Sequence, residues 1–156
     1  MKTNRKKRIL SIAVPLLTGG LAAFLTKDGM AAFEAVNKPP LSPPSWLFPV
    51  VWTVLYVLMG ISFYRIITSE NTQEQIQPAI GIYLWQLFFH FCWSLLFFGA
   101  ALYFAAFLWL IVLWILIVIM ILRFGKLDKT AGGLNIFYLL WVSFAGYLNL
   151  GIALLN

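Results

Sequence analysis

Four side chains between residues 83 and 93 could bring aromatic and hydrogen-bonding groups together inside this protein. Tyr83, Gln86, His90 and Trp93 follow one another at i, i+3, i+7 and i+10, which places them on one face of an α-helix. His90 lies twelve residues beyond Pro78 in a long uncharged run, near the middle of a helix that crosses a bilayer. Polar groups at that depth are costly and face the interior of a helix bundle. The pattern therefore predicts an interior site.

His90 allows three interpretations. It could be an axial ligand to haem iron, a general base, or a neutral imidazole that hydrogen-bonds a neighbouring helix. The sequence contains one His, and no second His or carboxylate accompanies it. Metal ligation is therefore weakly supported, we expect no metal site, and we favour the neutral, pocket-lining role.

Two other segments carry Trp at similar depth. Trp52 lies six residues past Trp46, about 9 Å deeper, and Trp141 lies eleven residues past Thr130, roughly 16 Å deeper, at the rise of an α-helix. A buried indole N–H needs a hydrogen-bond acceptor, so these positions indicate polar neighbours. Trp46, at a helix mouth, suits the interfacial belt of a membrane protein instead.

A proline-rich segment precedes Trp52: residues 38–46 read Lys-Pro-Pro-Leu-Ser-Pro-Pro-Ser-Trp. Prolines fix φ and hold the residues before them extended, so the segment cannot be ordinary helix until Pro44, which can open one. We predict a rigid lid over a covered, mostly apolar pocket. The residues expected to bind a ligand there are Pro43, Pro44, Trp52, Tyr56, Gln86, His90, Trp93, Tyr138, Trp141, Ala145 and Leu148.

The elements that hold these residues are predicted to be membrane-spanning helices. The chain is 62% hydrophobic and 10% charged, which is not the composition of a soluble globular domain. Its uncharged runs are 9–26, 39–64, 75–122 and 130–156. As one helix, the third run would be roughly 72 Å long, well beyond a ~30 Å hydrocarbon core. It must therefore be two spans, with a turn near residues 98–101.

The fold class expected is an all-α membrane protein, a single domain over 1–156 with five transmembrane helices and a proline-rich outer loop. Residues 30–36 could form one or two helical turns in that outer loop, while residues 68–77 and 125–130 are expected to be inner loops. No phosphate-binding glycine pattern or metal-ligand cluster is present. The predicted spans are 8–26, 44–67, 78–98, 102–124 and 131–154.

The basic residues predict the orientation. With a cytoplasmic N-terminus, nine Lys and Arg lie inside and only Lys27 and Lys38 lie outside, as the positive-inside rule requires. The first span could instead be a signal peptide, but 18 uncharged residues are long for a signal core and no A-x-A cleavage pattern follows. We predict a retained span in a multi-pass protein of the cytoplasmic membrane, and no nucleic-acid partner.

Several motifs resemble the translocator protein family, also called the tryptophan-rich sensory protein or TspO/MBR family. The similarity covers about residues 33–149 and its motifs fall in order on the predicted helices. They are Lys38-Pro39-x-x-x-Pro43-Pro44-x-Trp46, Val51-Trp52-x-x-Leu55-Tyr56-x-x-Met59-Gly60, Leu84-x-Gln86-Leu87 with Trp93, Phe97-Phe98-Gly99, Tyr138-Leu139-x-Trp141-x-x-Phe144-Ala145, and Leu148-Asn149.

The resemblance implies a five-helix bundle, often a homodimer, that binds porphyrins and benzodiazepine-like ligands. Some bacterial members are reported to break down protoporphyrin IX in light, and the positions matching Trp52 and Trp141 are implicated in that chemistry. These two residues are therefore the catalytic pair that the resemblance implies. No cofactor is required; the expected partners are protoporphyrin IX or haem, other flat apolar molecules, membrane lipid and a second copy of the chain.

The sequence departs from the family pattern at several positions. Leu41 replaces a Trp, Ala32-Phe33 replaces Trp-Tyr, His90 replaces a pocket Asn, and Ala105 replaces a fourth-helix Trp of mammalian relatives. The animal cholesterol motif is absent from the end of the last helix. These changes bear on ligand preference more than on fold.

Three functions remain open from the sequence. The leading hypothesis is a tetrapyrrole-binding membrane receptor or sensor, with light-dependent porphyrin degradation as an added activity. The alternative is a transporter of porphyrins or other amphipathic molecules, although the chain lacks the two-half symmetry of many carriers. A scaffold protein whose aromatic residues only pack is the third.

Overall fold

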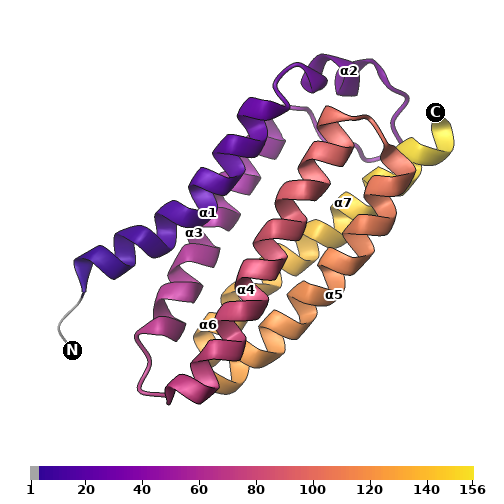
Figure 1. Cartoon of the computed structure of the whole chain (residues 1–156). Helices are drawn as coiled ribbons and strands as arrows, with labels where there is room; N and C mark the ends of the chain where they lie inside the picture. The colour runs from indigo at the N-terminus through magenta and orange to yellow at the C-terminus, as the bar shows by residue number, and fades with distance from the viewer. Residues whose placement is uncertain (1–3) are drawn as a thin grey trace.

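The computed structural model describes residues 4–156 as a bundle of long helices (Figure 1). Within that range five helical segments are long and apolar enough to cross a membrane, and no strand occurs. The predicted all-α fold and five spans are confirmed. The elements are α1 (Arg5–Leu25), α2 (Gly29–Ala35), α3 (Leu47–Ile67), α4 (Gln73–Ser94) continued by the π-helical turn η1 (Leu95–Gly99), α5 (Tyr103–Leu127), α6 (Lys129–Leu134) and α7 (Ile136–Leu155).

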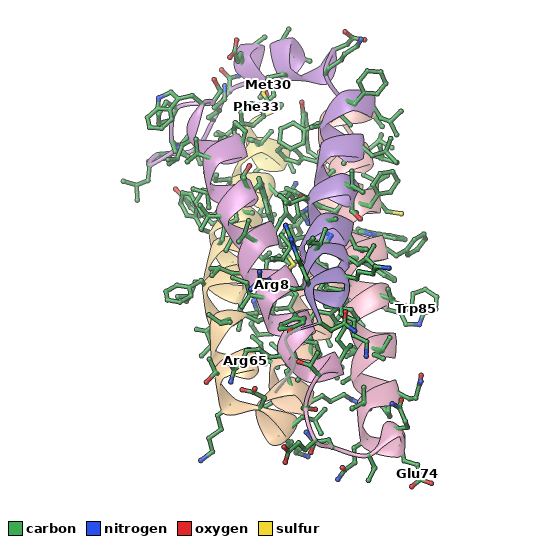
Figure 2. All side chains as sticks on the ribbon, turned by 90° about the vertical axis from the view of Figure 1, so that its left-hand side faces the viewer. Arg8, Met30, Phe33, Arg65, Glu74 and Trp85 are labelled. Carbon is green, nitrogen blue, oxygen red and sulfur yellow. The ribbon has the colours of Figure 1, made fainter. Side chains whose placement is uncertain are left out.

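The long helices pack in pairs: α1 contacts α3, α4 contacts α5, and α5 contacts α7. The short α2 and the segment after it lie across one end of the bundle, beside the C-terminus, and α6 lies at the opposite end (Figure 1). Figure 2 places Met30 and Phe33 at the α2 end and Glu74 at the other. We call the first of these the capped end. The predicted helical turns in the outer loop are thus present as α2.

Helix α1 crosses α3 at a glycine. A Cβ on Gly60 would lie 2.5 Å from the Cα of Ile12 and 2.8 Å from the carbonyl oxygen of Ser11, so only glycine permits this approach. Pro15 lies inside α1 and cannot donate a backbone hydrogen bond. Residues 5–10 are all exposed, and the amino-terminal turns of α1 lean away from the bundle (Figure 1).

The turn predicted near residues 98–101 separates α4 from α5. Helix α4 ends in the π-helical turn η1, where the Ala100 N–H donates to the Leu95 carbonyl oxygen at 2.9 Å. Ala101 then adopts a left-handed conformation with φ 52°, an uncommon one for a residue with a side chain. The Leu102 N–H closes the turn on the Leu96 carbonyl oxygen. The charge-free 75–122 run is therefore two spans.

Several predicted helix ends differ from the observed ones. Helix α3 begins at Leu47, because Pro44 opens only a single turn, closed by the Leu47 N–H on the Pro44 carbonyl oxygen. Helix α4 begins at Gln73 and not at residue 78. At this observed start, the Thr72 N–H donates to the Gln75 side chain. The predicted 125–130 loop is reduced to Asp128, the one residue between α5 and α6.

Asp128 joins three elements at the end opposite the cap. Its carboxylate accepts a hydrogen bond from the Ala131 N–H at the start of α6 and forms an ion pair with Arg65 of α3 at 2.8 Å. Partial burial favours the neutral carboxyl, but these hydrogen bonds and the Arg65 charge outweigh it and lower the pKa of Asp128. The cap and the ion pair therefore stabilise the ionised form.

We expect Asp128→Ala to lower the free energy of unfolding by about 1 kcal/mol through loss of the helix cap. Asp128→Asn keeps a capping oxygen and should cost less, since the Arg65 side chain is 43% exposed and such pairs contribute little. A carboxyl whose pKa is lowered on folding stabilises the protein above the pKa of an unfolded Asp and ceases to do so as the pH falls through the folded value. Denaturant titration in detergent should show a lower free energy of unfolding for Asp128→Asn than for the wild type at neutral pH, and no difference in acid.

Candidate functional site

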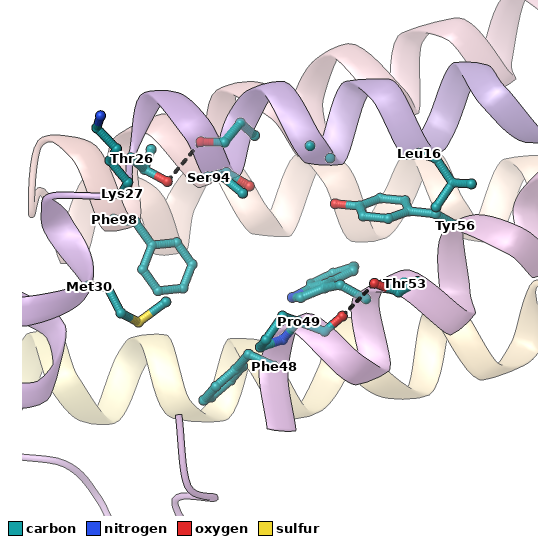
Figure 3. A pocket seen from close by; sticks show the side chains of 15 residues that line it. Leu16, Thr26, Lys27, Met30, Phe48, Pro49, Thr53, Tyr56, Ser94 and Phe98 are labelled. Atoms are coloured by element: carbon teal, nitrogen blue, oxygen red, sulfur yellow. Dashed lines mark hydrogen bonds between the residues drawn. The ribbon is translucent and has the colours of Figure 1, made fainter. Parts of the chain in front are cut away.

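A cavity of about 270 Å³ lies between α1, α3 and α4 near the capped end (Figure 3). Met30 and Phe98 stand at one end of it, and Leu16 and Tyr56 at the other. Small residues of α1 form one wall and aromatic residues of α3 the facing one. The full lining is Leu16, Gly19, Gly20, Ala22, Ala23, Thr26, Lys27, Met30, Phe48, Pro49, Trp52, Thr53, Tyr56, Ser94 and Phe98.

The cavity opens sideways between α1 and α3. Gly20 and Ala23 of α1 and Pro49 and Thr53 of α3 line it and are exposed on the outer surface of their helices. Further along, the contact at Gly60 holds the same two helices together. The opening therefore faces the surroundings of the bundle, which is lipid for a membrane-spanning protein.

The polar groups of the lining are mostly satisfied within their own helices. Thr26 Oγ1 donates to the Ala22 carbonyl oxygen at 2.8 Å, and Thr53 Oγ1 donates to the Pro49 carbonyl oxygen at 2.7 Å (Figure 3). Lys27 is exposed at the rim. The cavity thus offers an apolar interior and one cation at its outer edge.

Trp52 connects this cavity to a cluster of aromatic rings deeper in the bundle. Its indole lines the cavity together with the Tyr56 ring, on which it stacks with a centroid distance of 5.9 Å. Behind it lie side chains from α4 and α7. Its centroid distances to them are 4.4 Å for His90, 6.2 Å for Trp93, 6.2 Å for Tyr138 and 6.4 Å for Trp141.

Hydrogen bonds between helices hold the deeper cluster. Tyr56 Oη lies 2.6 Å from His90 Nε2, and Tyr138 Oη donates to Gln86 Oε1 at 2.8 Å. His90 is 1% exposed, so the structure shows it as a buried imidazole bonded across helices, as the third interpretation of its role required. Its Nδ1 and the indole Nε1 of Trp141 have no partner in the described part of the chain.

Four other Trp side chains have surroundings that explain their positions without a ligand. Trp46 is exposed, in agreement with a place in the interfacial belt. The Trp93 indole donates to Asn149 Oδ1 of α7 at 3.0 Å. Trp109 donates to the Phe89 carbonyl oxygen and Trp114 to Ser143, so both indoles join neighbouring helices.

The predicted ligand-binding residues divide into four groups. Trp52 and Tyr56 line the cavity, and Gln86, His90, Trp93, Tyr138 and Trp141 lie behind them in or beside the aromatic cluster. Ala145 and Leu148 are buried in α7. Pro43 and Pro44 are not among the residues that line the cavity.

The proline-rich segment is therefore not the cover that the sequence suggested. It packs along α7: a Cβ on Gly151 would lie 2.5 Å from Pro39, and Tyr147 Oη donates to the Pro40 carbonyl oxygen at 2.7 Å. Met30 of α2 and Lys27 before it close the outer end of the cavity instead. A stiff segment predicted to be a lid is an anchor for the last helix.

Sequence reasoning also missed the contribution of α1. Gly19 lies against the Tyr56 ring so closely that a Cβ there would overlap it. Gly20 and Ala23 leave the side opening free. The available signal was the group of small residues within 19–23, namely Gly19, Gly20, Ala22 and Ala23, a composition that marks close helix approach in membranes.

Comparison with known proteins agrees with these features. The TspO/MBR family model matches residues 11–155. The chain is 35% identical to the tryptophan-rich protein TspO of Chlorobaculum tepidum, over 96% of this chain and 98% of that protein. It is 36% identical to the TspO protein of Archaeoglobus fulgidus over 98% and 99% of the two chains, and 31% identical to the translocator protein of Bos taurus over 87% and 82%.

Proposed function

This chain belongs to the TspO/MBR family, and we propose that it is an integral membrane receptor or sensor that binds flat amphipathic tetrapyrroles such as protoporphyrin IX. The observation that carries the proposal is the cavity beside Trp52, which has an apolar lining, an indole and a phenol in one wall, and a side opening between α1 and α3. An aromatic macrocycle dissolved in the membrane would reach this opening without crossing water.

The cation at the rim supports a ligand with acidic groups. Lys27 follows the end of α1 at the capped end of the bundle, where a headgroup region would begin. A tetrapyrrole with carboxylate side chains would place its ring among Phe48, Trp52 and Tyr56 and its acids near Lys27. Because about 270 Å³ is below the usual size of a ligand site, the ring would enter edge-on and remain partly in the side opening.

Light-dependent degradation of the bound porphyrin is the added activity within the same proposal. Indole is readily oxidised, and an excited porphyrin accepts an electron from a ring in contact with it. The exposure of Trp52 to the cavity supports such a contact, and Trp141 lies behind it at 6.4 Å between ring centroids. Transport is less favoured, because the α1–α3 contact at Gly60 stands between the cavity and the opposite end of these helices.

Obstructing the cavity tests the binding proposal. A Cβ on Gly20 meets no atom within 4 Å, and Gly20 lines the cavity at its side opening, so Gly20→Phe should obstruct entry to the site without disturbing the helix. We expect protoporphyrin IX to quench the Trp fluorescence of the wild type saturably, and the variant to bind at least about tenfold more weakly, a change of 1.4 kcal/mol.

Gly81→Phe is the matched control. Gly81 lies inside α4 with equally free space around its Cβ and does not line the cavity, so this variant should bind like the wild type. Absence of saturable quenching in the wild type would refute porphyrin binding. Equal affinities for the wild type and both variants would place the ligand elsewhere.

A further inference from the structure

Tyr56 and His90 form a buried pair that porphyrin binding alone does not explain. Tyr56 Oη lies 2.6 Å from His90 Nε2, and the two residues come from α3 and α4. The phenol is the stronger acid of the two groups, so it donates and Nε2 accepts, which leaves the ring proton on Nδ1. We propose that this pair is a proton-coupled electron donor to Trp52, in which Tyr56 loses an electron and His90 takes its proton.

The geometry suits electron transfer from Tyr56 to Trp52. The two rings are stacked with centroids 5.9 Å apart and planes inclined by 24°, so no intervening group separates the donor from the acceptor. Gly19 of α1 backs the Tyr56 ring, and a side chain there would push the ring out of this position. The phenol is thus held between a glycine surface, the indole and the imidazole.

The step is balanced in electrons and protons. A one-electron oxidant, here the photoexcited macrocycle, first converts Trp52 to its radical cation and is itself reduced. Tyr56 then gives one electron to that cation, its O–H bond breaks, and the proton moves to His90 Nε2. The products are a neutral Trp52, a neutral Tyr56 phenoxyl radical and a His90 imidazolium.

Burial does not forbid this step. An unpaired charge inside an apolar bundle is costly, and His90 is 1% exposed. The charge, however, is already present on the Trp52 radical cation, whose ring lies 4.4 Å from the imidazole. The transfer moves one positive charge between adjacent rings and adds none to the interior.

His90 is also the base available to this phenol. The uncharged runs that form the spans contain no Asp or Glu, and the other phenol ring close to both Trp52 and His90 is that of Tyr138. Tyr138 differs from Tyr56 in its hydrogen-bond acceptor. Its ring is 6.2 Å from Trp52, but its hydroxyl donates to the amide oxygen of Gln86, which is not a base and cannot take up the proton. Of two phenols at similar distance, only Tyr56 can release its proton to a base.

The consequence is repair of the indole. Once Tyr56 has supplied an electron, Trp52 is again a reductant in contact with the cavity and escapes irreversible oxidation. This single repair of Trp52 after a photochemical oxidation rests on the proposed function. The redox property of the pair does not, because any one-electron oxidation of Trp52 should reveal it.

The test is laser photoionisation of the indoles in the full-length, ligand-free protein in detergent micelles. Transient absorption should show the tryptophan radical cation decaying while a neutral tyrosyl radical grows, and the growth should be slower in D₂O. Tyr56→Phe should remove this fast tyrosyl phase. His90→Asn should slow it by about 10²-fold, the lower end of what a positioned base contributes.

Tyr138→Phe is the matched control and should leave the fast phase intact. The proposal fails if Tyr56→Phe retains the fast phase, if Tyr138→Phe removes it, or if His90→Asn leaves both the rate and the isotope effect unchanged. Should a variant not fold, the wild type alone still tests the proposal, because growth of the tyrosyl radical that is equally fast in H₂O and D₂O would contradict a proton transfer to His90. Because no porphyrin is present, a negative result here leaves the proposed function standing, and failure of porphyrin binding leaves this result standing.

Discussion

Illumination with bound protoporphyrin IX is expected to leave the pigment intact in the Trp52→Phe, Trp141→Phe double variant while the wild type consumes it. Phenylalanine preserves an aromatic ring at both positions but is a far poorer electron donor than indole. We expect the initial rate of pigment loss to fall at least about tenfold, equivalent to 1.36 kcal/mol in the barrier. The single Trp52→Phe variant should account for most of this, because Trp52 lines the cavity and Trp141 lies behind it.

The measurement needs two controls. Trp85→Phe, Trp114→Phe removes the same number of indoles at exposed positions outside the cavity lining, and Trp85 points away from the bundle (Figure 2). This variant should degrade the pigment at the wild-type rate. Binding is followed by the absorption of the pigment itself, so that loss of chemistry is separated from loss of affinity. Equal photobleaching in all three proteins would exclude the two indoles as donors.

The number of spans could be predicted because charge is costly in lipid. Each uncharged run had to be long enough to cross the hydrocarbon core, and only the 75–122 run was too long for one crossing. The helix ends could not be predicted in the same way. Helix α4 begins five residues before the predicted start because polar residues such as Gln73 and Gln75 are compatible with a helix that extends beyond the hydrocarbon.

The part of the candidate site that could be predicted consists of polar and aromatic side chains, which need burial and hydrogen-bond partners inside a membrane. Helical spacing brought Tyr83, Gln86, His90 and Trp93 to one face, and all four are buried. Spacing within one helix says nothing about rotation against its neighbours, so the Tyr56–His90 bond was not foreseen. The small residues of α1 were missed for another reason: they have no reactive group, and they matter through the space they leave.

A valine at Gly60 is expected to have the largest effect on stability of any substitution considered. A Cβ at this position would lie 2.5 Å from the Cα of Ile12 and 2.8 Å from the carbonyl oxygen of Ser11. Backbone atoms cannot rotate away as a side chain does, so α1 must move off α3. We expect Gly60→Val to lower the free energy of unfolding by about 3 kcal/mol, the upper part of the range for overpacking, measured by denaturant titration in detergent.

The effect should reach the cavity, because α1 supplies the wall that faces Trp52. Protoporphyrin IX affinity is therefore expected to fall together with stability in Gly60→Val. Gly81→Val is the matched control: its Cβ meets no atom within 4 Å, and replacing a helical glycine should stabilise α4 by a few tenths of a kcal/mol. If the two valine variants proved equally stable, the α1–α3 contact would not hold the bundle together. If only affinity survived in Gly60→Val, the ligand would not lie against α1.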